Sequence, residues 1–170
     1  MDSLFKKLDK PAILLALAAT FILMNLLLNI LMPKGLALDL RFAYSANEAY
    51  AALENMGEKL REQYLIVIWT VDMPYILVYF LLLTGIFRKL LTGKNILILP
   101  LVVAMLDLME NLLVSGLILS FPTEHIFLGY LASFFTSSKW LFVGACLVYI
   151  LLGLLRKYLP KSPGDLDLKG

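Results

Sequence analysis

The stretch LVVAMLDLMENLLVSGLILS, residues 101–120, decides how the chain must fold, because it places two carboxylates and an amide inside an apolar run. The whole run, 96–119, is long enough to cross a bilayer core as a helix, which takes about 20 residues. An ionisable side chain at the centre of such a helix costs about 2.5–3.5 kcal/mol. The helix therefore needs neighbours that shield its polar face from lipid.

Composition supports a membrane protein. Of the 170 residues, 61% are hydrophobic and 16% are charged, whereas soluble domains are about 45–50% apolar. Three more apolar runs have the length of a span, at 12–32, 64–87 and 126–155. We predict an all-α, polytopic membrane protein with a bundle of four transmembrane helices. A single domain would cover 1–159, and 160–170 would be a flexible cytoplasmic tail.

The polar segment between the first two runs also shows helical spacing. Ser45 followed by Glu48 is a capping-box pattern. The apolar residues that then recur at helical spacing are Ala49, Tyr50, Leu53, Met56 and Leu60. We predict a short amphipathic helix at 46–63 on the outer membrane surface. Two other interpretations stay open: a solvated helix that bridges two spans, and a lid over a site that opens outward.

The basic residues predict the orientation. Ten lie on one side of the predicted spans: Lys6, Lys7, Lys10, Arg88, Lys89, Lys94, Arg156, Lys157, Lys161 and Lys169. On the other side, four basic residues of the long loop are accompanied by five acids. Cytoplasmic loops carry the excess of Lys and Arg, so we expect both termini in the cytoplasm, with the protein in the plasma or inner membrane if it is bacterial.

Polar side chains of all four spans fall at similar depth when a helical rise of about 1.5 Å per residue is applied. Asp107, Glu110 and Asn111 share one helix face, because they are three and four residues apart. We expect the polar faces to meet inside the bundle. The candidate catalytic residues are Asp72, Asp107 and Glu110, and the candidate ligand-binding residues are Asn25, Tyr75, Tyr79, Asn111, Thr136 and Lys139.

Three hypotheses for function follow from this predicted site. In the first, the site binds or transforms a lipid-like or apolar small molecule, with a proton donated by the Asp107/Glu110 pair and one accepted by Asp72. In the second, the polar residues join helices, and the protein is a structural or assembly subunit of a membrane complex. In the third, the acids relay protons or cations in coupled transport, with Lys139 as the counter-ion.

Other activities lack a sequence motif. No Gly-x-Ser-x-Gly elbow, HExxH, phosphate loop or CxxC occurs, so we expect neither a metal nor a cofactor. The basic residues flank the spans and form no single patch, which argues against nucleic acid as a partner. The expected partners are membrane lipid and a lipid-like ligand. A second copy of the chain and the subunits of a membrane complex remain alternatives.

Two further patterns concern helix geometry. Pro74 lies inside the second run and predicts a kink there, because proline cannot donate to the carbonyl of Thr70. Gly129, Ser133 and Ser137 form a ladder of small residues four apart, which favours close approach of another helix.

In length, span number and depth of its carboxylates, the chain resembles the bacterial lipoprotein signal peptidases. The resemblance is one of architecture. That family's signature segments do not match the sequence around Asp72 or Asp107, so it implies no catalytic assignment.

Overall fold

The computed structural model describes residues 7–8, 10–91 and 97–158, and the part of the chain that it describes is helical, without strands. The elements are α2 (Pro11–Leu31), α3 (Ala46–Val67), the π-helical turn η1 (Ile68–Asp72), α4 (Met73–Leu90), α5 (Ile98–Ser120) and α6 (Ile126–Tyr158). Four helices of the described part are long and apolar enough to cross a membrane, which confirms the predicted all-α class and the number of candidate spans. The predicted tail at 160–170 lies outside the described residues.

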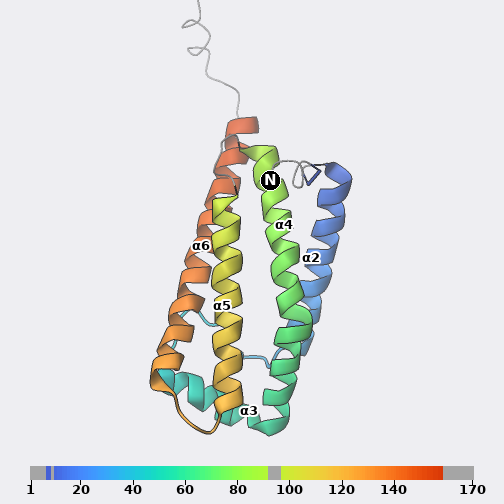
Figure 1. The fold of residues 1–170 in the computed structure, drawn as a ribbon. Helices are drawn as coiled ribbons and strands as arrows, with labels where there is room; N and C mark the ends of the chain where they lie inside the picture. Colours follow the sequence, from blue (N-terminus) through green and yellow to red (C-terminus); the bar gives the residue numbers. More distant parts are fainter. Residues whose placement is uncertain (1–6, 9, 92–96, 159–170) are drawn as a thin grey trace, which may run out of the picture.

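The long helices run side by side as a bundle (Figure 1). Helix α5 packs most extensively on α6, whereas α2 lies at the edge of the bundle against α4. The start of α2, the end of α4, the start of α5 and the end of α6 lie at one end, which we call the basic end because Lys10, Arg88, Lys89, Arg156 and Lys157 lie there. We call the opposite end the cap end.

The span predicted at 64–87 is part of a longer continuous helix, which we call the rod, and this rod begins earlier than predicted. Gly57 has a φ of 67° and breaks α3, and the chain beyond it continues through η1 and α4 to Leu90. The predicted amphipathic helix at 46–63 is therefore divided. Residues 46–56, which we call the cap helix, lie across the end of the bundle, and the remainder joins the rod (Figure 1). Leu60, predicted on the same apolar face, is 40% exposed because it lies beyond the break.

The cap helix buries its apolar face within the protein. Its capping box is present, with Ser45 accepting from the backbone of Glu48. The buried apolar residues of the cap helix are Ala46, Ala49, Tyr50, Ala52, Leu53 and Met56, and most of them pack in one cluster with Val114, Leu117 and Ile118 of α5. The break is braced by Arg61, which donates to the Leu53 carbonyl at 2.8 Å and lies over the Phe121 ring. The cap helix thus closes one end of the bundle.

The predicted distortion near Pro74 takes the form of a π-helical turn. Pro74 is the second residue of α4, and η1 directly precedes this helix. The amide of Met73 donates to the Ile68 carbonyl, five residues back, as in a π turn. Such a turn inserts an extra residue into the rod, so it changes which side chains of α4 face the bundle interior.

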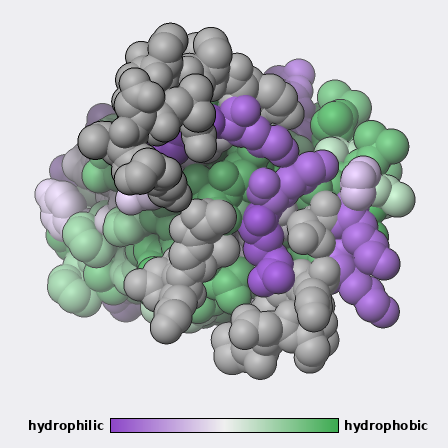
Figure 2. All heavy atoms as spheres, turned by 90° about the horizontal axis from the view of Figure 1, so that it is seen from above, coloured by the Kyte–Doolittle hydropathy of each residue, from purple (hydrophilic) through white to green (hydrophobic). Residues whose placement is uncertain are grey.

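Seen onto the basic end, hydrophilic residues lie on the end face and hydrophobic residues lie around the flanks (Figure 2). Exposed large apolar side chains also occur on all the long helices. This distribution is the one expected of a bundle whose sides face hydrocarbon and whose ends face water.

Candidate functional site: a buried acidic cluster

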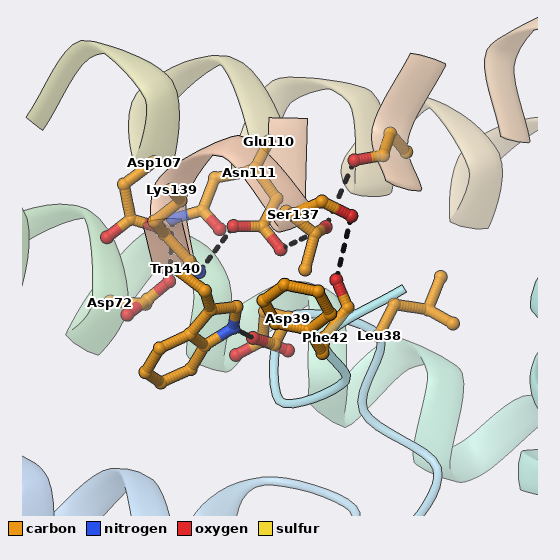
Figure 3. Close-up of polar contacts among 12 residues, drawn as sticks. Leu38, Asp39, Phe42, Asp72, Asp107, Glu110, Asn111, Ser137, Lys139 and Trp140 are labelled. Atoms are coloured by element: carbon orange, nitrogen blue, oxygen red, sulfur yellow. Dashed lines mark hydrogen bonds and ion pairs between the residues drawn. The ribbon is translucent and has the colours of Figure 1, made fainter. Parts of the chain in front are cut away.

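Helix α5 supplies three polar side chains to the interior of the bundle. Asp107, Glu110 and Asn111 are 6%, 0% and 1% exposed. Because they lie within one helical turn, their side chains emerge on one face of α5. Together with four residues of the neighbouring elements they form what we call the acidic cluster: Asp72, Tyr79, Asp107, Glu110, Asn111, Thr136 and Lys139. Figure 3 shows Asp72, Asp107, Glu110, Asn111 and Lys139 of this cluster.

Lys139 of α6 joins two of the carboxylates. Its Nζ lies 3.1 Å from Oδ1 of Asp107 and also forms an ion pair with Oε2 of Glu110. Glu110 accepts a second contact through Oε1, from the Thr136 hydroxyl at 2.6 Å. Removing an ion from water is costly, and close opposite charges with added hydrogen bonds offset that cost. The contacts account for how Glu110 can be fully buried between α5 and α6.

The remaining contacts connect α5 to the rod of η1 and α4. Asn111 Nδ2 donates to Oδ2 of Asp72 at 2.6 Å, and the Tyr79 hydroxyl donates to Oδ2 of Asp107 at 2.9 Å. Asp72 differs from the other two acids. Among the described residues, the ion pairs of Lys139 are with Asp107 and Glu110, and no Lys or Arg nitrogen lies within 4.0 Å of Asp72.

Two buried polar atoms of α5 lack a hydrogen-bond partner within the described part of the chain. They are Oδ1 of Asn111 and the hydroxyl oxygen of Ser115, one helical turn further along α5. Ser115 is 3% exposed, so neither residue is at the surface. A buried acceptor without a donor costs about 1–3 kcal/mol. The Asp72 side of the cluster therefore has unused acceptor capacity.

An aromatic row leads from the outside of the bundle to the cluster. The rings of Phe21 and Tyr75 stack with centroids 5.4 Å apart, and Tyr75 meets Tyr79 edge to face at 5.3 Å. Asn25 of α2 is exposed and donates to the Tyr75 hydroxyl at 2.7 Å. Of the predicted lining residues, Asn25 and Tyr75 thus lie at the edge, whereas Tyr79, Asn111, Thr136 and Lys139 lie inside.

The sequence analysis missed a fourth buried carboxylate. Asp39 belongs to the loop between α2 and α3, yet it is 8% exposed. Its Oδ1 accepts from the Tyr64 hydroxyl at 2.5 Å, and its backbone carbonyl accepts from the Trp140 indole at 3.3 Å (Figure 3). Burial raises the pKa of the Asp39 carboxyl, although the nearby Lys139 charge and the Tyr64 hydrogen bond act in the opposite direction. An aspartate in a polar loop carries no sequence pattern that distinguishes it from a solvated residue.

The ladder of small residues on α6 contacts this loop. The Ser133 hydroxyl accepts from the backbone amide of Tyr44 at 2.9 Å, and the Ser137 hydroxyl donates to the Phe42 carbonyl at 2.8 Å. A Cβ at Gly129 would lie 2.9 Å from that of Ala46. The predicted close approach of a helix is therefore made at Gly129 by the first residue of α3, whereas Ser133 and Ser137 contact the loop residues that precede this helix.

A groove of about 630 Å³ lies elsewhere, at the cap end between α5 and α6. Its lining residues are Gly116, Ser120, Glu124, His125, Ile126, Phe127 and Leu128, none of which belongs to the acidic cluster. Over the described residues, no group of three or more His, Cys, Asp or Glu side chains is arranged to hold a metal ion.

Comparison of the chain with protein-family models, with curated proteins and with solved structures gave no match.

Proposed function

We propose that the chain is an integral membrane protein with its basic end in the cytoplasm and its cap helix at the outer interface. The excess of Lys and Arg at one end of the bundle supports this orientation. The acidic cluster then lies within the membrane, on helices whose outer surfaces carry exposed Leu, Ile and Phe side chains.

We further propose that the acidic cluster binds an apolar small molecule and acts on it by carboxylate acid/base chemistry. One observation carries the proposal: within the described part of the chain three acids are buried close together, with Asp107 and Glu110 paired to Lys139 and Asp72 bonded to Asn111 outside these ion pairs. Intramembrane ionisable residues are expensive and typically mark functional sites. A protein that needed only a stable bundle would gain little from a third buried acid outside the ion pairs.

The contacts suggest how the proposed roles divide. Lys139 holds Asp107 and Glu110 together, so these three groups can hold and donate a proton as a unit. Asp72 is not in the ion-pair network, and its hydrogen-bond partner among the described residues is the Asn111 amide, so it is the proposed acceptor. A substrate that contacts both groups would gain one proton from the Asp107/Glu110 pair and lose another to Asp72, with no net change in its protonation.

Photolabelling in lipid nanodiscs tests this function. The probes are hexadecanol, hexadecanoic acid and hexadecylamine, each carrying a diazirine next to its polar group. We expect at least one probe to label peptides that contain Asp72 or Asn111, and Asp107→Asn/Glu110→Gln to abolish that labelling in a protein that still folds. Labelling of the exposed face of α2 is the internal control for contact with lipid. Labelling confined to exposed faces with every probe would refute the proposal.

A second candidate, a structural or assembly role, is favoured by the connectivity of the cluster. Its hydrogen bonds and ion pairs join α4, α5 and α6, and each interhelical hydrogen bond in a membrane protein contributes about 0.6 kcal/mol. Under this role, Asp107→Asn/Glu110→Gln loses folding or association with a partner. A folded variant that has lost only probe labelling supports the chemical site.

A further inference from the structure

The Asp72 side of the acidic cluster offers hydrogen-bond acceptors without donors. Asp72 accepts from Asn111, and Oδ1 of the same Asn111 amide has no partner. Because the donating nitrogen and this oxygen belong to one amide group, the orphan oxygen lies close to the Asp72 carboxylate. Asp72 and Asn111 are 6% and 1% exposed, so bulk water does not satisfy them. A ligand for this position has to donate hydrogen bonds.

The charge balance indicates that such a donor is a cation. Lys139 is engaged by Asp107 and Glu110, and the loop adds a fourth buried carboxylate at Asp39. A cation next to Asp72 would form a charge-assisted hydrogen bond with a buried carboxyl that has no Lys or Arg nitrogen within 4.0 Å among the described residues. A neutral hydroxyl could fill one acceptor but would form weaker hydrogen bonds.

The surroundings indicate an apolar attachment to that cation. Tyr75 and Tyr79 follow Asp72 at helical spacing along α4, and their ring faces attract cations. The row continues through Phe21 to α2, which buries none of its residues in the bundle. The aromatic row therefore runs from the acidic cluster to α2, whose outer surface carries exposed Ile22 and Leu26, and this is the direction we assign to an alkyl chain.

We propose that Asp72 and Asn111 bind the ammonium group of a long-chain primary amine, with the alkyl chain directed along the aromatic row toward the bilayer. The inference rests on the proposed function, since it names the ligand class of that site. The ammonium donates to the Asp72 carboxylate and to Oδ1 of Asn111, which satisfies the orphan acceptor.

The test compares two of the diazirine probes, hexadecylamine and hexadecanol, in phosphatidylcholine nanodiscs at neutral pH. We expect the amine to label peptides around Asp72 and Asn111 at least ten-fold more than the alcohol does. Asp72→Asn should reduce amine labelling at least ten-fold and leave alcohol labelling unchanged. Glu62→Gln, which alters an exposed acid of α3, is the matched control and should leave both unchanged.

Competition distinguishes the two sources of a primary ammonium group. If unlabelled hexadecylamine displaces the probe and phosphatidylethanolamine does not, the ligand is a free amine. If both displace it, the site takes the ethanolamine headgroup as well. Either result supports recognition of the ammonium group.

The outcomes separate this inference from the proposed function. Equal labelling of the site by alcohol and amine, or full amine labelling of Asp72→Asn, would overturn the inference and leave the proposed function standing. Absence of site labelling by every probe would overturn both. If Asp72→Asn does not fold, the wild-type melting temperature decides: hexadecylamine should raise it more than hexadecanol does, and equal shifts contradict the inference.

Discussion

Helices α2 and α5 are similar in length and apolarity, but they differ in how much of each helix is buried. They have 21 and 23 residues, and both are apolar enough to cross a membrane. Helix α2 buries no residue, whereas α5 buries ten, among them Asp107, Glu110, Asn111 and Ser115. Length and apolarity therefore predict a span, but the polar residues on one face determine whether the span lies at the centre or the edge of the bundle.

Removing Lys139, the one cation among the described residues that pairs with the acids of α5, should have the largest effect. Lys139→Met leaves Asp107 and Glu110 buried side by side without compensation, and breaking a buried pair in this way costs about 3–5 kcal/mol. We expect a correspondingly lower free energy of unfolding in detergent, measured by denaturant titration. Lys59→Met, at an exposed position of α3, is the control. Equal stability of the two variants would contradict a central role for the ion pairs.

Truncating matched leucines would sharpen the contrast between the helices. Leu117 of α5 is 0% exposed and Leu26 of α2 is 57% exposed. Leu117→Ala leaves a cavity beneath the cap helix and should cost about 2–5 kcal/mol. Leu26→Ala should change stability by less than about 0.5 kcal/mol. Thermal unfolding of both variants measures the difference, and a similar loss in each would show that α2 is packed against something in the membrane.

The pH dependence of stability tests the carboxylate supplied by the loop. The pKa of Asp39 is raised by burial, so the folded state binds this proton more tightly than the unfolded state does. Its contribution is complete below the unfolded pKa, near 4, and is lost as pH rises through the raised folded pKa. Asp39→Asn should therefore gain stability relative to wild type as pH rises. Melting temperatures from pH 4 to 8 measure this difference, and parallel curves would contradict it.

A small effect is also expected for a hydrogen bond at the edge of the bundle. Asn25→Ala removes the hydrogen bond from α2 to the Tyr75 hydroxyl, which should cost about 0.6 kcal/mol. The same measurement on Asn111→Ala provides the comparison, since Asn111 is buried in α5. A loss at Asn25 as large as that at Asn111 would mean that α2 is fixed to the bundle mainly by this contact.

The spans were predictable because their signal is local. Apolar runs give helices whose ends differ from prediction by a few residues, except where the rod begins at the break in α3. Gly57 is the residue from which this break could have been predicted, because a glycine within a helical pattern marks a point where the chain can adopt positive φ. Depth and spacing likewise anticipated that Asp72, Asp107, Asn111 and Lys139 would come together.

The contribution of the loop was not predictable in the same way. Asp39 is buried because Tyr64, Trp140 and the small residues of α6 hold the loop in place, and all of these contacts are distant in sequence. Helical periodicity relates residues three or four positions apart and gives no information about such contacts. Similarly, the small-residue ladder predicted a close neighbour on α6 but could not distinguish a helix from an extended segment.

The π turn at Ile68–Asp72 lies between two parts of one continuous rod and fixes the angular position of α4 relative to the part that precedes it. Each residue of a helix turns the chain by about 100°, so deleting one residue, such as the exposed Trp69, would rotate everything that follows relative to Tyr64. Tyr64 could keep its bond to Asp39 while Asp72 and Tyr79 swung away from α5. A one-residue change in length, with no change in chemistry, would thus disassemble the proposed site and spare the cap.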